Sequence, residues 1–450
     1  MRTKTLSRLL LVLVLLPGAV LAQGADFTRY VAVGDSLTAG FSSGGLVRTV
    51  QNSSYPALLF RQARGQQGGF EQPLVTEPGI PAALELRSLL PVPTIGPKPG
   101  LGQPANLNLQ RPYDNLAVPG ARVHDVVARV TDNGGLHDLI LRGLGTQLQQ
   151  AAALRPTFAT VWIGNNDVLA AATSGIVIEG VTLTPVAAFE ADLRAIASTL
   201  AGVGARLAFA NIPDVTSIAF VTAIPPVVVN PATSQPVLVG GNPVPLIGPN
   251  GPLGGADRVL LTASALLAQG IGIPAGLGGT GQPLPDSVVL SAAEIATIAA
   301  RVNAYNTLIR TVAQERNAAL VDFNALLREL ATTGVRVGGL TYTAAFLTGG
   351  IFSYDGVHPE RFGYAFVANA FIEAINDHYD DDIPLVDLYP FVFGPSVAGD
   401  AELSSFVGFV FTAEAERNLR FALNVPSDEE LKKAKDPRRK PPRRRRGGRG

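Results

Sequence analysis

Short runs of apolar residues recur along the chain, and each is bounded by Gly, Pro, Asp or Asn. Runs of this length and composition are typical of buried strands. The five predicted strands are RYVAVGD at 29–35, DNLAVPG at 114–120, TFATVWIG at 157–164, RLAFANIPD at 206–214 and AALVDF at 318–323.

Helical patterns separate these runs. Thr184 and Pro185 begin a predicted helix that ends near Gly202, and Ser291 with Glu294 forms a capping box. After that box, apolar residues recur at helical spacing at Ile295, Ile298, Val302, Tyr305, Ile309 and Val312. Strands that alternate with helices predict an α/β fold with a mostly parallel sheet covered on both faces. Functional residues then gather at the carboxyl ends of the strands.

The two ends of the chain differ from this pattern. Arg2, Lys4 and Arg8 precede an apolar stretch, and small residues end at Ala22, which is typical of a cleaved signal peptide over residues 1–22. We therefore expect an exported protein, periplasmic or extracellular. An uncleaved membrane anchor is the alternative, but the apolar run is shorter than the roughly 20 residues that span a bilayer.

Composition adds two constraints. The chain has no cysteine, which excludes disulfides and cysteine-ligated metals, so stability must come from packing. Its formal net charge of zero hides a tail at 432–450 with 11 basic residues and one acidic residue. We expect this Pro/Gly/Arg-rich tail to be disordered, as a solvated tail or in contact with an anionic envelope or membrane surface. An exported protein is not expected to have a nucleic-acid partner.

Candidate catalytic residues follow the predicted strands directly. Ser36 follows the first strand, Gly120 the second, and Asn166 in GNND the third. Asp355 and His358 lie three residues apart in SYDGVHP, on a loop that should enter a helix after Pro359. Nucleophilic catalysis by serine needs a base within reach and a third group that orients the base, and these residues are of the right types.

These blocks carry a family resemblance. GDSL at 34–37, NLAVPGA with Gly120, GNND at 164–167 and DGVH at 355–358 resemble the SGNH/GDSL hydrolase superfamily in order and placement, over about residues 30–378. The resemblance implies a flavodoxin-like three-layer α/β/α fold with a five-stranded, mostly parallel sheet. It implies Ser36 as nucleophile, His358 as general base and Asp355 as its orienting acid. It also implies an oxyanion hole of the Ser36 and Gly120 amides and the Asn166 side chain, with no metal or organic cofactor.

Each residue also has a structural interpretation. Ser36 is a plausible helix cap, and Asn166 is a common turn residue. A second serine competes, because GFSSG at 40–44 matches the nucleophile elbow of α/β-hydrolases and would make Ser42 the nucleophile. That elbow needs a strand before it and a helix after it. The preceding strand ends at Gly34 and the following residues are rich in glycine, so we favour Ser36.

The predicted organisation is a hydrolase domain at 23–380, a C-terminal extension of unknown role at 381–431 and the basic tail. Pro-rich inserts are predicted at about 73–112 and 215–290, and PVVVNPATSQPVLVGG in the second resembles a hairpin. Residues 215–256 carry no charge, which suits a lipid or short-acyl ester, although the inserts could equally pack on the body. We expect an exported carboxylic-ester hydrolase. The alternatives are an O-acyltransferase or deacetylase acting on envelope polysaccharide, and a non-catalytic envelope-binding protein.

Overall fold

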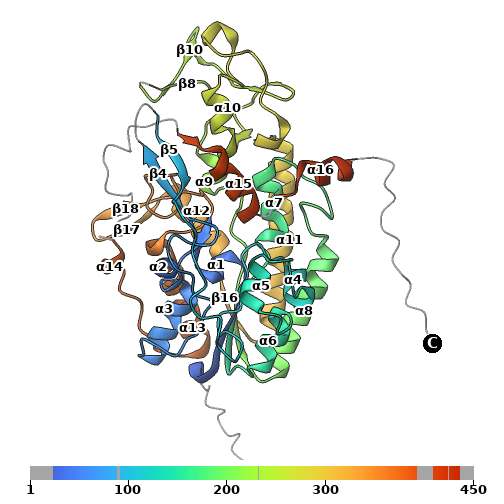
Figure 1. Cartoon of the computed structure of the whole chain (residues 1–450), viewed down its shortest axis with the longest axis vertical. Coiled ribbons are helices and arrows are strands. Elements are labelled where there is room, and N and C mark those ends of the chain that lie inside the picture. The colour runs from blue at the N-terminus through green and yellow to red at the C-terminus, as the bar shows by residue number, and fades with distance from the viewer. Residues whose placement is uncertain (1–23, 89–91, 232, 393–408, 424, 436–450) are drawn as a thin grey trace, which may run out of the picture.

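The central sheet is parallel and is built from the predicted apolar runs. The computed structural model describes residues 24–88, 92–231, 233–392, 409–423 and 425–435 (Figure 1). In spatial order the strands are β1 (Tyr30–Gly34), β6 (Phe158–Trp162), β7 (Arg206–Ala210) and β16 (Ala319–Val321).

The second predicted strand, at 114–120, is an edge segment beside β1 rather than a regular strand. The Leu116 N–H donates to the Ala32 carbonyl at 3.0 Å, yet Asn115 opposite Ala32 is the single ladder pair there. The Asn115 side chain accepts the Ala117 N–H at 3.2 Å, so a local turn competes with regular pairing. The predicted five-stranded sheet is therefore four strands and this segment, in the flavodoxin-like order.

Alternate residues of β1 face opposite layers. Val31 and Val33 belong to one hydrophobic cluster, and Tyr30 and Ala32 belong to another. Helices that contribute to the first cluster are α4 (Val123–Ala128), α5 (Leu136–Leu141), α6 (Gln147–Ala153), α8 (Val186–Gly202) and α11 (Ala292–Glu315). The second cluster holds α3 (Tyr55–Arg64), and both α12 (Phe323–Thr332) and α13 (Arg361–Tyr379) contribute to the two clusters. The predicted three-layer α/β/α fold is confirmed.

The two predicted helices with recognisable ends are present. The helix α8 ends at Gly202 as expected, with Pro185 as its N-cap residue. The helix α11 begins with the expected capping box of Ser291 and Glu294. Five of the six residues in its apolar stripe are buried and the sixth, Ile295, is partly buried, so this face packs on the first layer.

The second insert lies beyond the sheet edge, at the upper end of the molecule in Figure 1. Its elements are short: α9 (Ala219–Thr222), β8 (Val229–Asn230), β9 (Gln235–Pro236), β10 (Leu238–Val239), β11 (Asn242–Pro243), β12 (Ile247–Gly248), β13 (Gly251–Pro252), β14 (Arg258–Val259), α10 (Ser264–Ala268) and β15 (Val289–Leu290). The strands β8 and β9 pair antiparallel, which confirms the predicted hairpin. Seven buried apolar residues give this insert a small core of its own.

The C-terminal extension returns to the body of the protein. The strand β19 (Val410–Phe411) pairs with β5 (Thr94–Pro97) of the first insert, which also pairs with β4 (Leu84–Ser88). The helix α15 (Ala413–Ala422) follows and buries Ala415, Leu419 and Ala422. The remaining elements include α2 (Arg48–Gln51), β17 (Val335–Val337), β18 (Leu340–Tyr342) and α14 (Tyr389–Val392).

The predicted tail begins too early. Residues 432–435 end the helix α16 (Asp428–Lys435), where Lys433 lies one turn after Glu429 and pairs with it, so disorder is the wrong prediction for these four positions. The signal peptide at 1–22 and the rest of the tail, 436–450, lie outside the described residues. None of the helices in the described part combines the length and apolarity that crossing a bilayer requires.

Candidate active site

Ser36 lies at the carboxyl end of β1, where the strand turns into the short helix α1 (Ser36–Ala39). Asp35 caps this helix by accepting the Leu37 N–H, and its second oxygen accepts the Asn165 amide at 2.9 Å. Burial raises the pKa of Asp35 to about 6, although the Asn165 amide, the Leu37 amide and the His358 charge oppose the shift. The serine is therefore held on a turn fixed by a buried carboxyl, and only 4% of Ser36 is exposed.

Gly34, the last residue of β1, allows this turn to approach β6. A Cβ atom at this position would lie 2.2 Å from the Thr38 hydroxyl and 2.5 Å from the Trp162 carbonyl. No side chain fits that space, because real Cβ contacts are longer. Gly34 and Trp162 are also paired in register, so the serine turn and the loop after β6 begin at the same sheet edge.

Asp355 and His358 lie on the loop between β18 and α13. The His358 Nδ1 is 2.8 Å from Asp355 Oδ2, and both residues are fully buried or nearly so. Asp355 Oδ1 accepts the backbone N–H groups of Val357 and His358, at 2.9 and 2.8 Å. Burial alone would raise the pKa of Asp355, but the His358 charge and these hydrogen bonds outweigh it and lower the pKa. Asp355 is therefore an ionised acceptor.

The other ring nitrogen of His358 is available. Because Asp355 accepts from Nδ1, the neutral ring carries its lone pair on Nε2. This buried Nε2 has no hydrogen-bond partner among the described residues, Ser36 included. Catalytic hydrogen bonds are often absent or long without substrate, so this geometry leaves the nitrogen able to accept a proton.

Ser36 and His358 share neighbours. The Tyr364 hydroxyl donates to the Phe41 carbonyl at 2.6 Å and lies 3.5 Å from the Ser36 carbonyl. The Phe41 ring centroid is 4.9 Å from the centroid of His358. The structure thus brings the end of β1 and the Asp355–His358 loop to one place, as the sequence predicts.

Gly120 and Asn166 meet at the same sheet edge. The Val118 N–H donates to the Gly34 carbonyl at 3.2 Å, which sets the Gly120 turn beside the serine turn. Gly120 has a φ of 80°, a backbone conformation that favours glycine. Asn166 begins α7 (Asn166–Ser174), and its side chain donates to the Ala121 carbonyl at 3.0 Å. The predicted oxyanion-hole residues therefore adjoin one another.

Asp167, the residue after Asn166, holds the segment between the Gly120 turn and α4. Its Oδ2 accepts the Val123 N–H at 2.9 Å, at the start of α4. Burial raises the pKa of Asp167 to about 7, against the lowering effect of its hydrogen bonds. Asp167 is a link between the loop after β6 and the Gly120 loop.

The hairpin that follows α1 is not predicted from the sequence pattern. The strands β2 (Phe41–Ser42) and β3 (Gly45–Leu46) pair antiparallel across a two-residue turn of Ser43 and Gly44, with φ values of 50° and 76°. The Gly44 N–H donates to Asp355 Oδ2 and the Ser43 N–H to the Ser353 hydroxyl, both at 2.8 Å. The signal in the sequence is the adjacent pair of small residues, Ser43 and Gly44, because tight hairpin turns favour residues that readily take a positive φ.

This hairpin is inconsistent with a nucleophile elbow at residues 40–44, which would make Ser42 the nucleophile. A strand rather than a helix follows Ser42, and its hydroxyl is buried without a partner among the described residues. The other histidines pair elsewhere: His124 with Asp192, His137 with Asp132, and His378 with the Asn317 carbonyl. In the part of the chain that the structure describes, no three His, Asp or Glu side chains group closely enough to hold a metal ion.

Comparison with known proteins assigns this site to a class. The profile of the GDSL-like lipase/acylhydrolase family matches residues 30–371, so the chain belongs to that family and is a carboxylic-ester hydrolase. No curated protein matches the chain.

Solved structures resemble the chain only distantly. Axe2, an acetylxylan esterase from Geobacillus stearothermophilus, is 14% identical with a TM-score of 0.34, covering 77% of this chain and 93% of its own. LAE5, an α/β hydrolase from the metagenome of Lake Arreo, Spain, is 15% identical with a TM-score of 0.35, covering 79% and 98%. Likenesses of this size carry no argument about substrate.

Proposed function

We propose that the protein is an exported serine esterase of the lipase/esterase type that acts through an acyl-enzyme on Ser36. The observation that carries the proposal is the environment of the His358 ring. Its Nδ1 lies 2.8 Å from Asp355, which also accepts hydrogen bonds from three backbone amides. Its Nε2 has no hydrogen-bond partner among the described residues. A ring held in this tautomer is the general base that a serine nucleophile needs.

The residues then have distinct roles. Ser36 Oγ attacks the ester carbonyl carbon as His358 Nε2 takes its proton, and the carbonyl oxygen becomes an oxyanion. The Ser36 and Gly120 amides and the Asn166 side chain donate to that oxyanion. His358 returns the proton to the leaving alcohol, and the acyl group stays on Ser36. Water activated by His358 then releases the acid, and Asp355 keeps the ring oriented in both steps.

Export to the periplasm or the exterior belongs to this proposal. It rests on the signal-peptide pattern of residues 1–22. In that location the basic residues 436–450 would face anionic envelope or membrane surfaces. The substrate is a lipid or short-acyl ester, because the uncharged insert at 215–256 suits an acyl chain better than a charged group.

The test compares two serines six residues apart. Ser36→Ala should reduce hydrolysis of p-nitrophenyl esters to near background and abolish labelling by a fluorophosphonate probe. Ser42→Ala removes a buried hydroxyl without a described partner and should leave both close to wild type. The opposite ranking would assign the reaction to Ser42 and reject the proposal.

A further inference from the structure

A side-chain hydrogen bond joins the serine turn to the loop that follows β6. The Asn165 Nδ2 donates to Asp35 Oδ2 at 2.9 Å, and the two residues are 5% and 0% exposed. Asp35 directly precedes the proposed nucleophile, Ser36. Asn165 directly precedes the proposed oxyanion donor, Asn166. The bond therefore connects the segment of the attacking oxygen to the segment that receives the developing charge.

Three consecutive polar side chains at the start of α7 hold three different segments. Asn165 bonds to the serine turn. Asn166 donates to the Ala121 carbonyl at 3.0 Å. Asp167 accepts the Val123 N–H at 2.9 Å, at the start of α4. Hydrogen bonds depend steeply on distance and angle, so together these contacts fix where α7 begins relative to the serine turn and to α4.

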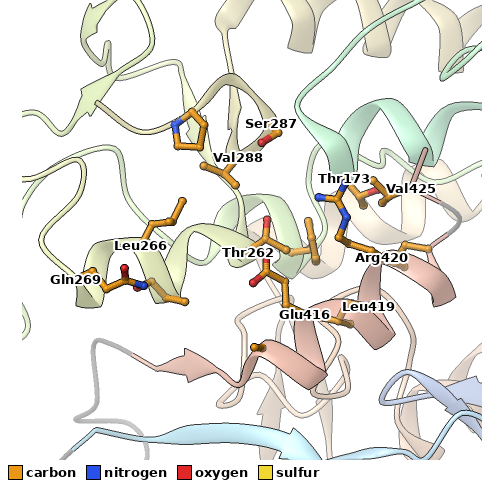
Figure 2. A pocket seen from close by; sticks show the side chains of 15 residues that line it. Thr173, Thr262, Leu266, Gln269, Ser287, Val288, Glu416, Leu419, Arg420 and Val425 are labelled. Atoms are coloured by element: carbon orange, nitrogen blue, oxygen red, sulfur yellow. The ribbon is translucent and has the colours of Figure 1, made fainter. Parts of the chain in front are cut away.

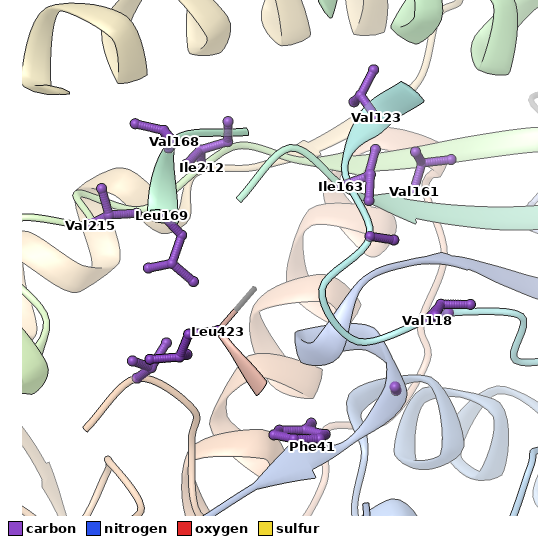
Figure 3. Packing of buried hydrophobic residues seen from close by; sticks show 14 of the residues in the cluster. Phe41, Val118, Val123, Val161, Ile163, Val168, Leu169, Ile212, Val215 and Leu423 are labelled. Atoms are coloured by element: carbon purple, nitrogen blue, oxygen red, sulfur yellow. The ribbon is translucent and has the colours of Figure 1, made fainter. Parts of the chain in front are cut away.

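Apolar packing surrounds these bonds. Figure 3 shows four of the side chains, Val118, Val123, Ile163 and Val168, which flank the segments that the polar residues join. All four are buried and belong to the first hydrophobic cluster. Apolar contacts are not directional, so they keep the segments together but leave small shifts between them possible. The hydrogen bonds are the contacts that exclude such shifts.

The other end of α7 lies beside free space. Thr173, in the last turn of this helix, lines a cavity of about 270 Å³ between α7, α10 and α15 (Figure 2). Atoms that border a cavity lack contacts on one side, so close packing does not fix this end of the helix fully. The position of Asn166 at the start of α7 therefore depends on the polar contacts made there.

We propose that Asp35 and Asn165 are positioning residues that set the distance between Ser36 and Asn166. The Ser36 oxygen must reach the ester carbon while the Asn166 amide faces the oxygen on that same carbon. A small error in this distance therefore weakens contacts made in the transition state more than it weakens substrate binding. The inference rests on the proposed serine esterase function and adds two residues that act through their neighbours.

The first test removes the donor. Asn165→Ala should lower kcat for p-nitrophenyl acetate by about tenfold and leave KM within about twofold. Asn211→Ala is the matched control, because Asn211 follows β7 and donates at 2.7 Å to Asp322, the residue that caps α12 after β16. The same kind of bond thus joins two segments that carry no proposed catalytic residue. Its loss should leave kcat within about twofold.

The second test exchanges the partners. Asn165→Asp sets a second carboxylate against Asp35, and two facing carboxylates share one proton. Its kcat relative to wild type should fall by about tenfold from about pH 7 to about pH 9.5, as that proton is lost. Adding Asp35→Asn should abolish this fall, because the new amide donates to the new carboxylate and still accepts the Leu37 N–H. A flat ratio in Asn165→Asp, or an equal fall in the double variant, contradicts the proposal.

Thermal unfolding separates a loss of kcat from a loss of stability, and the pH series keeps the proposal testable if Asn165→Ala does not fold. A folded Asn165→Ala with unchanged kcat, or with the same loss as Asn211→Ala, would overturn the proposal. If Ser36→Ala is inactive while the Asn165 variants behave like the control, this inference alone fails. If Ser36→Ala cleaves the acetate like the wild type, the proposed function fails and this inference fails with it.

Discussion

Two hairpins of the same local structure lie in opposite surroundings. The first, β2–β3, turns at Ser43 and Gly44, and the second, β10–β11, turns at Gly240 and Gly241. All four turn residues have positive φ, from 50° to 84°. The strand residues of the first are buried, while Leu238 and Val239 of the second are 57% and 62% exposed.

The difference lies in what surrounds each turn. In the first hairpin the turn amides donate to Ser353 and Asp355 of a loop more than 300 residues away. In the second, a Cβ on either turn glycine would meet nothing within 4 Å. Turn geometry alone therefore does not make a hairpin part of a site. The first hairpin matters because its Gly44 amide holds Asp355, the carboxylate 2.8 Å from His358 Nδ1.

The strongest way to break this arrangement is to change the carboxylate that the first hairpin holds. Asp355→Asn places an amide beside His358 Nδ1 and favours the wrong tautomer, so kcat should fall by about 10⁴. Asp132→Asn is the control, because Asp132 pairs with His137 at 3.2 Å and has no role in the proposed reaction. Steady-state kinetics on both variants decide the matter: a loss below about tenfold in Asp355→Asn removes Asp355 from the catalytic set.

The Asn166 side chain, a proposed oxyanion donor, bonds to the Ala121 carbonyl rather than to the hairpin, which gives a second reference point. Asn166→Ala should lower kcat by about 10² to 10³ with little change in KM, because its amide donates to charge that develops in the transition state. If KM rises while kcat holds, Asn166 binds the ground-state substrate instead.

Proline substitutions compare the two hairpins directly. Gly44→Pro removes the N–H that donates to Asp355 and imposes a φ near −65° where the chain needs 76°, so kcat should fall about 10- to 100-fold. Gly241→Pro creates the same conflict at a φ of 84° but should leave kcat within about twofold. Equal losses in the two variants would mean that the turn acts through general stability rather than through Asp355.

The same contrast explains what could be predicted from sequence. Strand and helix periods are local, so β1, β6, β7, β16 and α11 were predictable, and sheet geometry brings Ser36, Gly120 and Asn166 to one edge. The roles of these residues stay predictions. Contacts across long sequence distances leave no periodic signal. The Gly44–Asp355 bond spans 311 residues, and β19 of the C-terminal extension pairs with β5 of the first insert, so neither contact could be predicted.

The smallest expected effect concerns a carboxyl beside the first hairpin. Partly buried Glu360 accepts the Ser43 hydroxyl at 3.4 Å, and burial, followed by the nearby Asp355 charge, raises its pKa to about 7 from an ordinary 4.5. The folded protein thus holds this proton more tightly than the unfolded chain does. Its contribution to stability is complete below about pH 4.5 and is lost as the pH rises to about 7.

Glu360→Gln keeps the shape of the side chain and removes that titration. Thermal unfolding at pH 5 and pH 8 should show a drop in Tm for the wild type that is smaller by a few degrees in the variant. The drop should not vanish, because burial also raises the pKa values of Asp35 and Asp167. The second hairpin provides no comparable titration, since residues 215–256 carry no charged side chain. An identical drop in both proteins would mean that Glu360 is ionised throughout this range, and that the Ser43 contact does not couple the first hairpin to pH.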